Sequence, residues 1–166
     1  MPVSMDVRGL DDIMGMLDAL DDKRLMDAAR RGLQRGLQDI RGEAQMLCPK
    51  DTGALKNSIK TRTRFEGDEL VGEVYVGKKY GVFVEMGTGP KGEENHKGVN
   101  PDLLAKTTYS PEGWVYPTGK DDPDEKFRYT LGQPARPFLY PAYKSQKHKV
   151  NEKIAAEVIR EAEKGG

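Results

Sequence analysis

The stretch that decides the fold runs from residue 25 to residue 49 and reads LMDAARRGLQRGLQDIRGEAQMLCP. Its apolar residues recur at steps of three and four, which places them on one stripe of an α-helix. They are Leu25, Ala29, Leu33, Leu37, Ile40, Ala44 and Leu47. The helix is expected to end at Cys48, because Pro49 disfavours helical backbone in the residue before it. The stretch therefore predicts one long amphipathic helix.

Two glycines lie one turn apart in this helix, inside a short duplication in which RGLQ is followed by RGLQ over residues 31–38. Each glycine costs roughly 1 kcal/mol of helix stability relative to alanine. Two interpretations stay open. Gly32 and Gly36 form a groove that another helix or a subunit approaches closely, or they are glycines tolerated near the solvent-facing side.

The segments before the long helix are short. Residues 3–7 fit an edge strand, and residues 10–20 carry apolar side chains at helical spacing. Asp21 and Asp22 supply an N-cap for the long helix. Four aspartates within residues 1–20 argue against a signal peptide, and no apolar run is long enough to span a membrane.

After the long helix, Asp51 or Thr52 is expected to cap a short helix with Leu55 and Ile59 facing inward. A β-hairpin pattern follows in residues 59–76, with its turn at residues 66–69.

The next segment, residues 80–86, fits either a buried strand or an apolar helical turn. Residues 87–134 are then polar and rich in glycine and proline, and only residues 113–116 look like strand. So long a loop is unusual inside a compact domain. Residues 89–131 are therefore predicted to be a binding arm or a segment that orders only in a complex. Limited proteolysis of the free protein should cut there first.

A final charged helix closes the chain. Val150, Ile154, Val158 and Ala162 are predicted to line one of its faces.

Composition narrows the class of protein. The 166 residues fit one domain, predicted to span residues 1–166. The 27 basic and 27 acidic residues give a net charge of zero, whereas proteins that bind nucleic acid through phosphates usually carry a basic excess. Nucleic acid is therefore not expected as the main partner. The single cysteine, Cys48, excludes an intrachain disulfide and a Cys-rich metal site.

A catalytic site would have to use the few reactive groups present. Cys48 could act as a nucleophile with His96 or His148 as its base, but a packed thiol at the end of a buried helix face explains it better. His96 could ligate a metal with Glu93 and Glu94, but it lies in a charged segment where a solvated loop is the simpler interpretation.

Two further candidates are equally weak. Asp51 and Glu85 could form a carboxylate pair, yet Asp51 is already explained as a cap. The glycine-rich stretch at residues 87–90 lacks the Lys-Ser/Thr of a phosphate loop. We therefore expect no catalysis, no cofactor and no metal. A nucleic-acid-associated accessory protein and a small hydrolase remain as alternatives.

Three separated motifs point in one direction. Residues 44–58 read AxxxCPxDTGALKNS, residues 80–88 read YGVFVEMGT, and residues 136–142 read RPFLYPA. In this order and rough spacing they resemble the tail-component family of lambdoid and related long-tailed phages, whose members are described as minor tail, tail-completion or head–tail joining proteins of the neck. The resemblance spans about residues 10–158, covers residues 89–131 only loosely, and departs at Cys48 and Gly81, where alanine is common.

The resemblance implies an α+β fold, in which N-terminal and C-terminal helices pack on an antiparallel β-sheet with a long loop insertion. It also implies a non-enzymatic virion protein that acts by forming a ring or another homo-oligomer. The implied partners are further copies of itself, the phage head–tail connector, and tail tube or tail terminator proteins. The implied location is the tail or neck of the virion, reached through the host cytoplasm during assembly.

The candidate structural or interface residues come from the motifs and the glycine pair. They are Gly32, Gly36, Asp51, Thr52, Gly53, Leu55, Tyr80, Glu85, Gly87, Thr88, Pro137, Phe138 and Pro141. Gly53 and Gly87 fit places where the backbone needs freedom or close approach.

Two of the motifs lead to sharper expectations. Pro137 and Pro141 predict a stiff extended segment that holds Phe138, which we place in the core rather than at a subunit interface. Glu85 has three possible roles. It accepts from the backbone N–H groups at residues 88–89, pairs with an arginine such as Arg136, or faces solvent.

Overall fold

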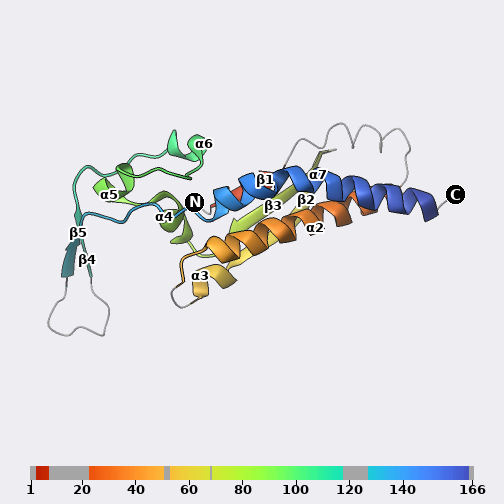
Figure 1. Cartoon of the computed structure of the whole chain (residues 1–166). Helices are drawn as coiled ribbons and strands as arrows, with labels where there is room; N and C mark the ends of the chain where they lie inside the picture. Colours follow the sequence, from red (N-terminus) through yellow and green to blue (C-terminus); the bar gives the residue numbers. More distant parts are fainter. Residues whose placement is uncertain (1–2, 8–22, 51–52, 68, 118–126, 165–166) are drawn as a thin grey trace.

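The computed structural model describes residues 3–7, 23–50, 53–67, 69–117 and 127–164. Its main body is a three-stranded antiparallel sheet with the strand order β1–β3–β2, packed against two long helices (Figure 1). The strands are β1 (Ser4–Val7), β2 (Ile59–Glu66) and β3 (Glu69–Val76), and the helices are α2 (Lys23–Leu47) and α7 (Leu139–Lys164). The α+β fold expected from the resemblance is confirmed.

The sheet forms as the sequence pattern predicts. Strands β2 and β3 pair from Ile59 opposite Val76 to Glu66 opposite Glu69, so the hairpin turns within residues 66–69 as predicted. Strand β1 pairs with the other side of β3 and lies at the edge. Gly72 on β3 faces the helices, because a Cβ atom there would lie 2.8 Å from a side-chain atom of Leu33.

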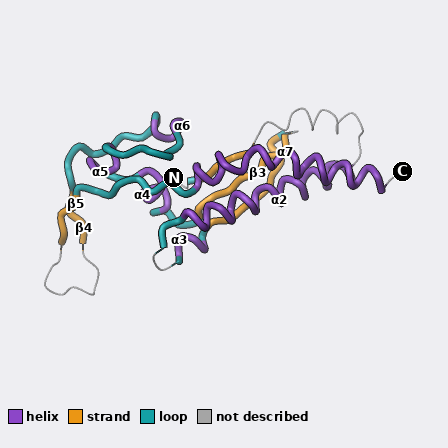
Figure 2. Tube along the Cα trace, in the orientation of Figure 1, coloured by secondary structure: helices purple, strands orange, loops and turns teal. Residues whose placement is uncertain are grey.

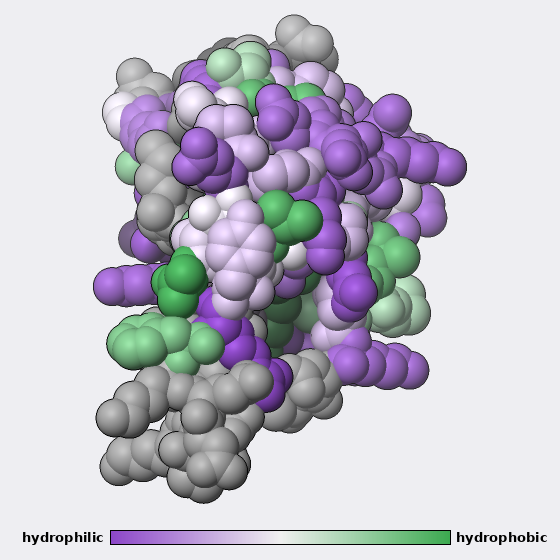
Figure 3. Space-filling model, turned by 90° about the vertical axis from the view of Figure 1, so that its left-hand side faces the viewer, coloured by the Kyte–Doolittle hydropathy of each residue, from purple (hydrophilic) through white to green (hydrophobic). Residues whose placement is uncertain are grey.

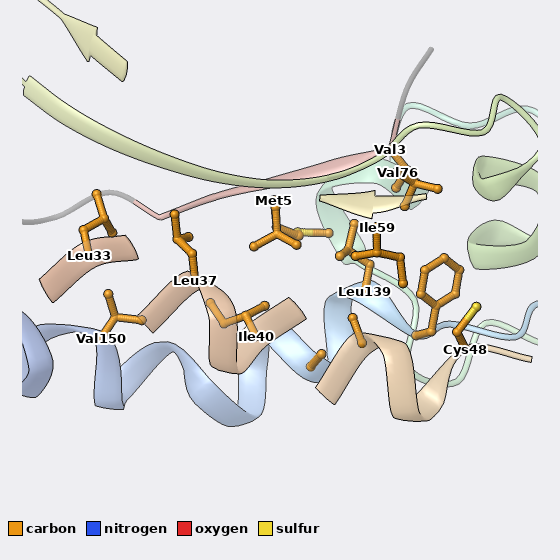
Figure 4. Close-up of a cluster of buried hydrophobic side chains, with 14 of the residues drawn as sticks. Val3, Met5, Leu33, Leu37, Ile40, Cys48, Ile59, Val76, Leu139 and Val150 are labelled. Atoms are coloured by element: carbon orange, nitrogen blue, oxygen red, sulfur yellow. The ribbon is translucent and has the colours of Figure 1, made fainter. Parts of the chain in front are cut away.

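Helix α2 buries most of the predicted stripe, from Leu25 to Ala44. Leu47 is an exception, since it is 46% exposed. Cys48 takes the core position at this end of the helix instead and is 3% exposed, which confirms it as a packed thiol (Figure 4).

Helix α7 runs antiparallel to α2 and makes its most extensive contacts with that helix. Val150 and Ile154 are fully buried and Val158 is half-buried, but Ala162 is exposed, against expectation. The reason is length. Ile154 lies against Gly32 and Val150 against Gly36, so two turns further on Ala162 is level only with the first turn of α2.

The segment between the sheet and α7 has more structure than a loop. A short helix, α3 (Ala54–Asn57), lies before the sheet hairpin, between α2 and β2. The segment after the sheet holds, in chain order (Figure 2), α4 (Gly81–Met86), α5 (Gly89–Glu93), α6 (Pro101–Leu104), β4 (Trp114–Pro117) and β5 (Phe127–Thr130). Residues 81–86 are therefore helical, and Tyr80 is the residue before this helix. We call residues 89–132 the arm. Its predicted strand is confirmed as β4, whereas α5, α6 and β5 were not predicted, and its mobility stays a prediction.

Several expectations fall outside the described residues. They are the helix at residues 10–20 and the caps assigned to Asp21, Asp22, Asp51 and Thr52. Among the helices that the structure describes, none has both the length and the apolar character needed to cross a membrane.

Candidate functional site

The three sequence motifs meet at one end of the body, around a small cleft of about 170 Å³. The cleft is lined by Pro49, Gly53 and Leu55 from the first motif, Tyr80 and Val84 from the second, Arg136 from the third, and Gln133. Segments far apart in the sequence are therefore folded into one junction. The motifs define a structural unit rather than three independent features.

Glu85 is the centre of this junction. Its side chain is fully buried, and its carboxylate accepts hydrogen bonds from three consecutive backbone N–H groups at the start of α7. Oε2 accepts from Phe138 at 2.8 Å and from Leu139 at 2.9 Å, and Oε1 accepts from Tyr140 at 2.9 Å. None of the three expected roles for Glu85 is correct. The sequence offered no sign that the first N–H groups of a helix more than fifty residues away would lie beside it.

The chemistry of this contact is that of a helix cap supplied by a distant residue. The first N–H groups of a helix lack acceptors within the helix, and the helix dipole favours negative charge there. Burial raises the pKa of the Glu85 carboxyl, and the hydrogen bonds from Leu139, Phe138 and Tyr140 act in the opposite direction. A buried carboxylate with all these partners fixes α4 onto the start of α7.

The prolines of the third motif play a different part from the one predicted. Helix α7 begins at Leu139, so Pro141 lies in its first turn and the segment between the prolines is not extended. A proline is tolerated there because the first N–H groups of a helix have no intrahelical acceptor. Phe138 is fully buried beside the helix start, as the core assignment expects.

Gly87 and Thr88 close the base of the arm. The N–H of Thr88 donates to the carbonyl of Gln133 at 2.9 Å, and the N–H of Gln133 donates to the carbonyl of Thr88 at 3.1 Å. Gly87 has φ of +74°, and a Cβ atom there would lie 2.6 Å from the backbone nitrogen of Ala135. Only glycine fits this crossing. Both ends of the arm are thus tied together where it leaves the junction.

The glycine pair of α2 forms the groove that the first interpretation predicted, and α7 of the same chain fills it. A Cβ atom on Gly32 would lie 2.5 Å from the Cα of Ile154, and one on Gly36 would lie 2.9 Å from a methyl group of Val150. These two glycines therefore serve the helix–helix contact inside the chain and leave no room for a subunit.

The remaining motif residues have simpler places. Gly53 adopts φ of +77° just before α3, which is the backbone freedom predicted for it, and Leu55 is buried. Tyr80 precedes α4 and is 44% exposed at the rim of the cleft.

Two of the candidate reactive groups, Cys48 and His96, are packed against neighbouring side chains. Burial raises the pKa of the Cys48 thiol, whereas a nucleophilic cysteine needs a lowered one. His96 is half-buried and stacks on Tyr109 at a ring separation of 5.4 Å, so the solvated-loop interpretation is wrong. Among the described residues, no three His, Cys, Asp or Glu side chains are grouped so as to hold a metal ion.

Sequence reasoning missed a second surface, on the arm. A groove of about 630 Å³ lies between α4, α5 and the β4–β5 hairpin, with Phe83, Met86, Tyr109 and Trp114 among its lining residues. Phe127 and Tyr129 are each 64% exposed on the same hairpin. The only signal in the sequence was the alternation of Phe127 and Tyr129 within a polar stretch.

The junction is held together by packing, backbone hydrogen bonds and a capping carboxylate. Comparison with known protein families gave a match. Residues 11–87 match the family model HK97-gp10_like, described as "Bacteriophage HK97-gp10, putative tail-component". Over this span the chain is similar to a phage tail component, and the resemblance seen in the motifs is confirmed. A search of the curated proteins and of the solved structures gave no significant match.

Proposed function

We propose that this protein is a structural component of a tailed-phage virion, which completes the tail or joins it to the head at the neck without catalysis. The match of residues 11–87 to a phage tail-component family carries the proposal. The first motif lies inside the matched span, and nearly all of the second does too.

The geometry of the junction supports a structural role. The titratable group at its centre, Glu85, is occupied by three backbone N–H donors and is fully buried, so it has no access to a substrate. Cys48 is likewise packed into the core.

In this role the protein assembles with itself into a ring or another homo-oligomer. That oligomer then contacts the head–tail connector and the tail tube or tail terminator. Assembly takes place in the host cytoplasm, and the product stays in the virion. The large apolar side chains exposed on the arm support an assembling protein, because contiguous exposed apolar surface marks interaction sites.

The test is a phage that lacks the gene for this chain. Electron micrographs should show DNA-filled heads and separate tails, and wild-type protein supplied from a plasmid should restore joined particles. Joined, infectious particles made without the protein would overturn the proposal.

A filter-binding assay at low salt tests the alternative that the protein binds nucleic acid, because contacts with phosphates are strongest at low salt. We expect no retention of DNA or RNA. Strong, salt-sensitive retention would point to an accessory protein instead.

A further inference from the structure

The β4–β5 hairpin of the arm has two unlike faces. In its antiparallel register Trp114 lies opposite Thr130 and Val115 lies opposite Tyr129. Because side chains alternate between the faces of a strand, Trp114 and Thr130 share one face, and both line the 630 Å³ groove. Val115 and Tyr129 lie on the other face, together with Phe127 two residues before Tyr129.

This second face is apolar and open. Val115 is 59% exposed, and Phe127 and Tyr129 are each 64% exposed. Figure 3 shows this end of the molecule, where a few hydrophobic side chains lie at the surface among polar ones. Within the described part of the chain, β4 and β5 pair only with each other. A lone two-stranded ribbon is marginally stable in water and gains stability when a partner covers its apolar face.

We propose that the ribbon face of one copy, formed by Val115, Phe127 and Tyr129, docks into the groove of a second copy of this chain. The inference rests on the proposed assembly role and names the surface that carries it. The groove presents Phe83 and Trp114, which are 54% and 39% exposed and are suitable contacts for aromatic side chains.

We place a second copy in the groove because the same chain carries both an apolar groove and an apolar ribbon face. Each copy carries a ribbon face and a groove, and they lie on opposite sides of the same hairpin. Surfaces of this kind match head to tail, and each added copy leaves one ribbon face and one groove open. Such a contact adds copies one after another until the rotation between neighbouring copies closes a ring. A patch that binds the same patch on a second copy forms only a twofold dimer.

The area is sufficient for a weak contact that a ring reinforces. An aromatic side chain buries about 150–250 Å². From the exposed fractions of Phe127, Tyr129, Phe83 and Trp114, together with Val115, the contact would cover roughly 500 Å² of apolar surface. A standard interface buries about 1,600 Å², slightly more than half of it apolar. The contact therefore supplies about half of that apolar area, and assembly depends on protein concentration.

The first test measures self-association of the full chain by sedimentation. The ribbon variant carries Phe127→Ser with Tyr129→Ser. The matched control carries Met46→Ser with Ile159→Ser, two large side chains on the body that are 73% and 58% exposed. The ribbon variant should associate about a hundredfold more weakly than wild type, because central aromatic side chains dominate interface energy. The control should associate like wild type, and both should melt like it.

The second test sets the direction of the contact by disulfide cross-linking in a Cys48→Ala background. Val115→Cys places a thiol on the ribbon face, and Thr108→Cys places one at the groove, where Thr108 is exposed. A mixture of the two variants should form a cross-linked dimer, whereas either variant alone should not. A cross-link in Val115→Cys alone would show a face-to-face dimer and overturn the head-to-tail arrangement.

The outcomes separate this inference from the proposed function. If the ribbon variant associates like wild type, or if wild type stays a monomer at high concentration, the docking of copies through the ribbon is wrong. The virion role would stand in either case, because the phage lacking the gene tests it independently.

Discussion

The body and the arm of this molecule treat their apolar side chains in opposite ways. In the body, Leu33, Ile40 and Phe138 are fully buried between the helices and the sheet. In the described part of the arm, Val99 is the only buried hydrophobic side chain, while Phe127 and Tyr129 are mostly exposed. The body therefore uses its hydrophobic side chains for folding. The arm, tied at its base by Thr88 and Gln133, keeps them available for a partner.

The largest expected effect of a single change belongs to the body. Phe138→Ala should lower the free energy of unfolding by about 3–5 kcal/mol, because it leaves a cavity in the core. Tyr129→Ala on the arm should change it by less than about 0.5 kcal/mol, as is usual at exposed positions. Denaturant titration of both variants, alongside their oligomeric state, tests the contrast. A Phe138→Ala variant that unfolds like wild type but no longer assembles would move Phe138 to an interface.

The next effect concerns the link between body and arm. Glu85→Ala removes the acceptor of three backbone N–H groups, two of them in buried hydrogen bonds, and should cost about 3 kcal/mol, since each unsatisfied donor is expensive. Glu85→Gln keeps one acceptor oxygen and should cost less. Urea unfolding curves of the two variants measure the difference. Equal losses would mean that the acceptor oxygen kept by Glu85→Gln contributes nothing, because glutamine fills the same space as glutamate and leaves no cavity.

Three glycines of α2 give a graded series within one helix. Gly32→Ala should destabilise by about 1–3 kcal/mol, because the methyl group meets the backbone of α7. Gly36→Ala should cost less, since the added methyl group would come within 3.0 Å only of side-chain atoms of Val150, and a side chain can move more easily than backbone. Gly42 has nothing within 4 Å, so Gly42→Ala should stabilise by up to about 1 kcal/mol. Thermal melts that rank the three variants in another order would contradict the packing of α7 on α2.

The smallest effect is a pH dependence. Burial raises the pKa of Glu85 in the folded state above its unfolded value of about 4.3. Its contribution to stability is then complete below the unfolded pKa and is lost as the pH rises through the folded pKa. Wild type should therefore gain stability relative to Glu85→Gln as the pH falls from 7 towards 4. A relative loss of stability on acidification would mean that the hydrogen bonds from the three N–H groups lower the pKa of Glu85 by more than burial raises it.

The sequence predicted the body well because its contacts follow regular periods. The stripe of α2, the hairpin of β2 and β3, and the burial of Phe138 could all be read from local patterns. The glycines at positions 32 and 36 indicated close approach, but nothing local identified α7 as the helix that approaches.

The junction and the arm were harder because their contacts are not local. Glu85 accepts from N–H groups more than fifty residues away, and no spacing rule connects the two segments. In the arm, the elements are only four or five residues long and bury too few side chains to give a periodic pattern of apolar residues. The sequence therefore did not predict α5, α6 and β5. The exposed face of the hairpin became visible only once the register of β4 and β5 was known.

Hydrogen–deuterium exchange, compared between the dilute free chain and the assembled form, tests the contrast of body and arm most directly. The helices α2 and α7 and the central strand β3 should be protected to the same degree in both states. Residues 113–116 and 127–131 should exchange fast in the free chain and become protected on assembly. Protection gained on the body helices instead, with the hairpin unchanged, would show that assembly uses the body and would contradict this account.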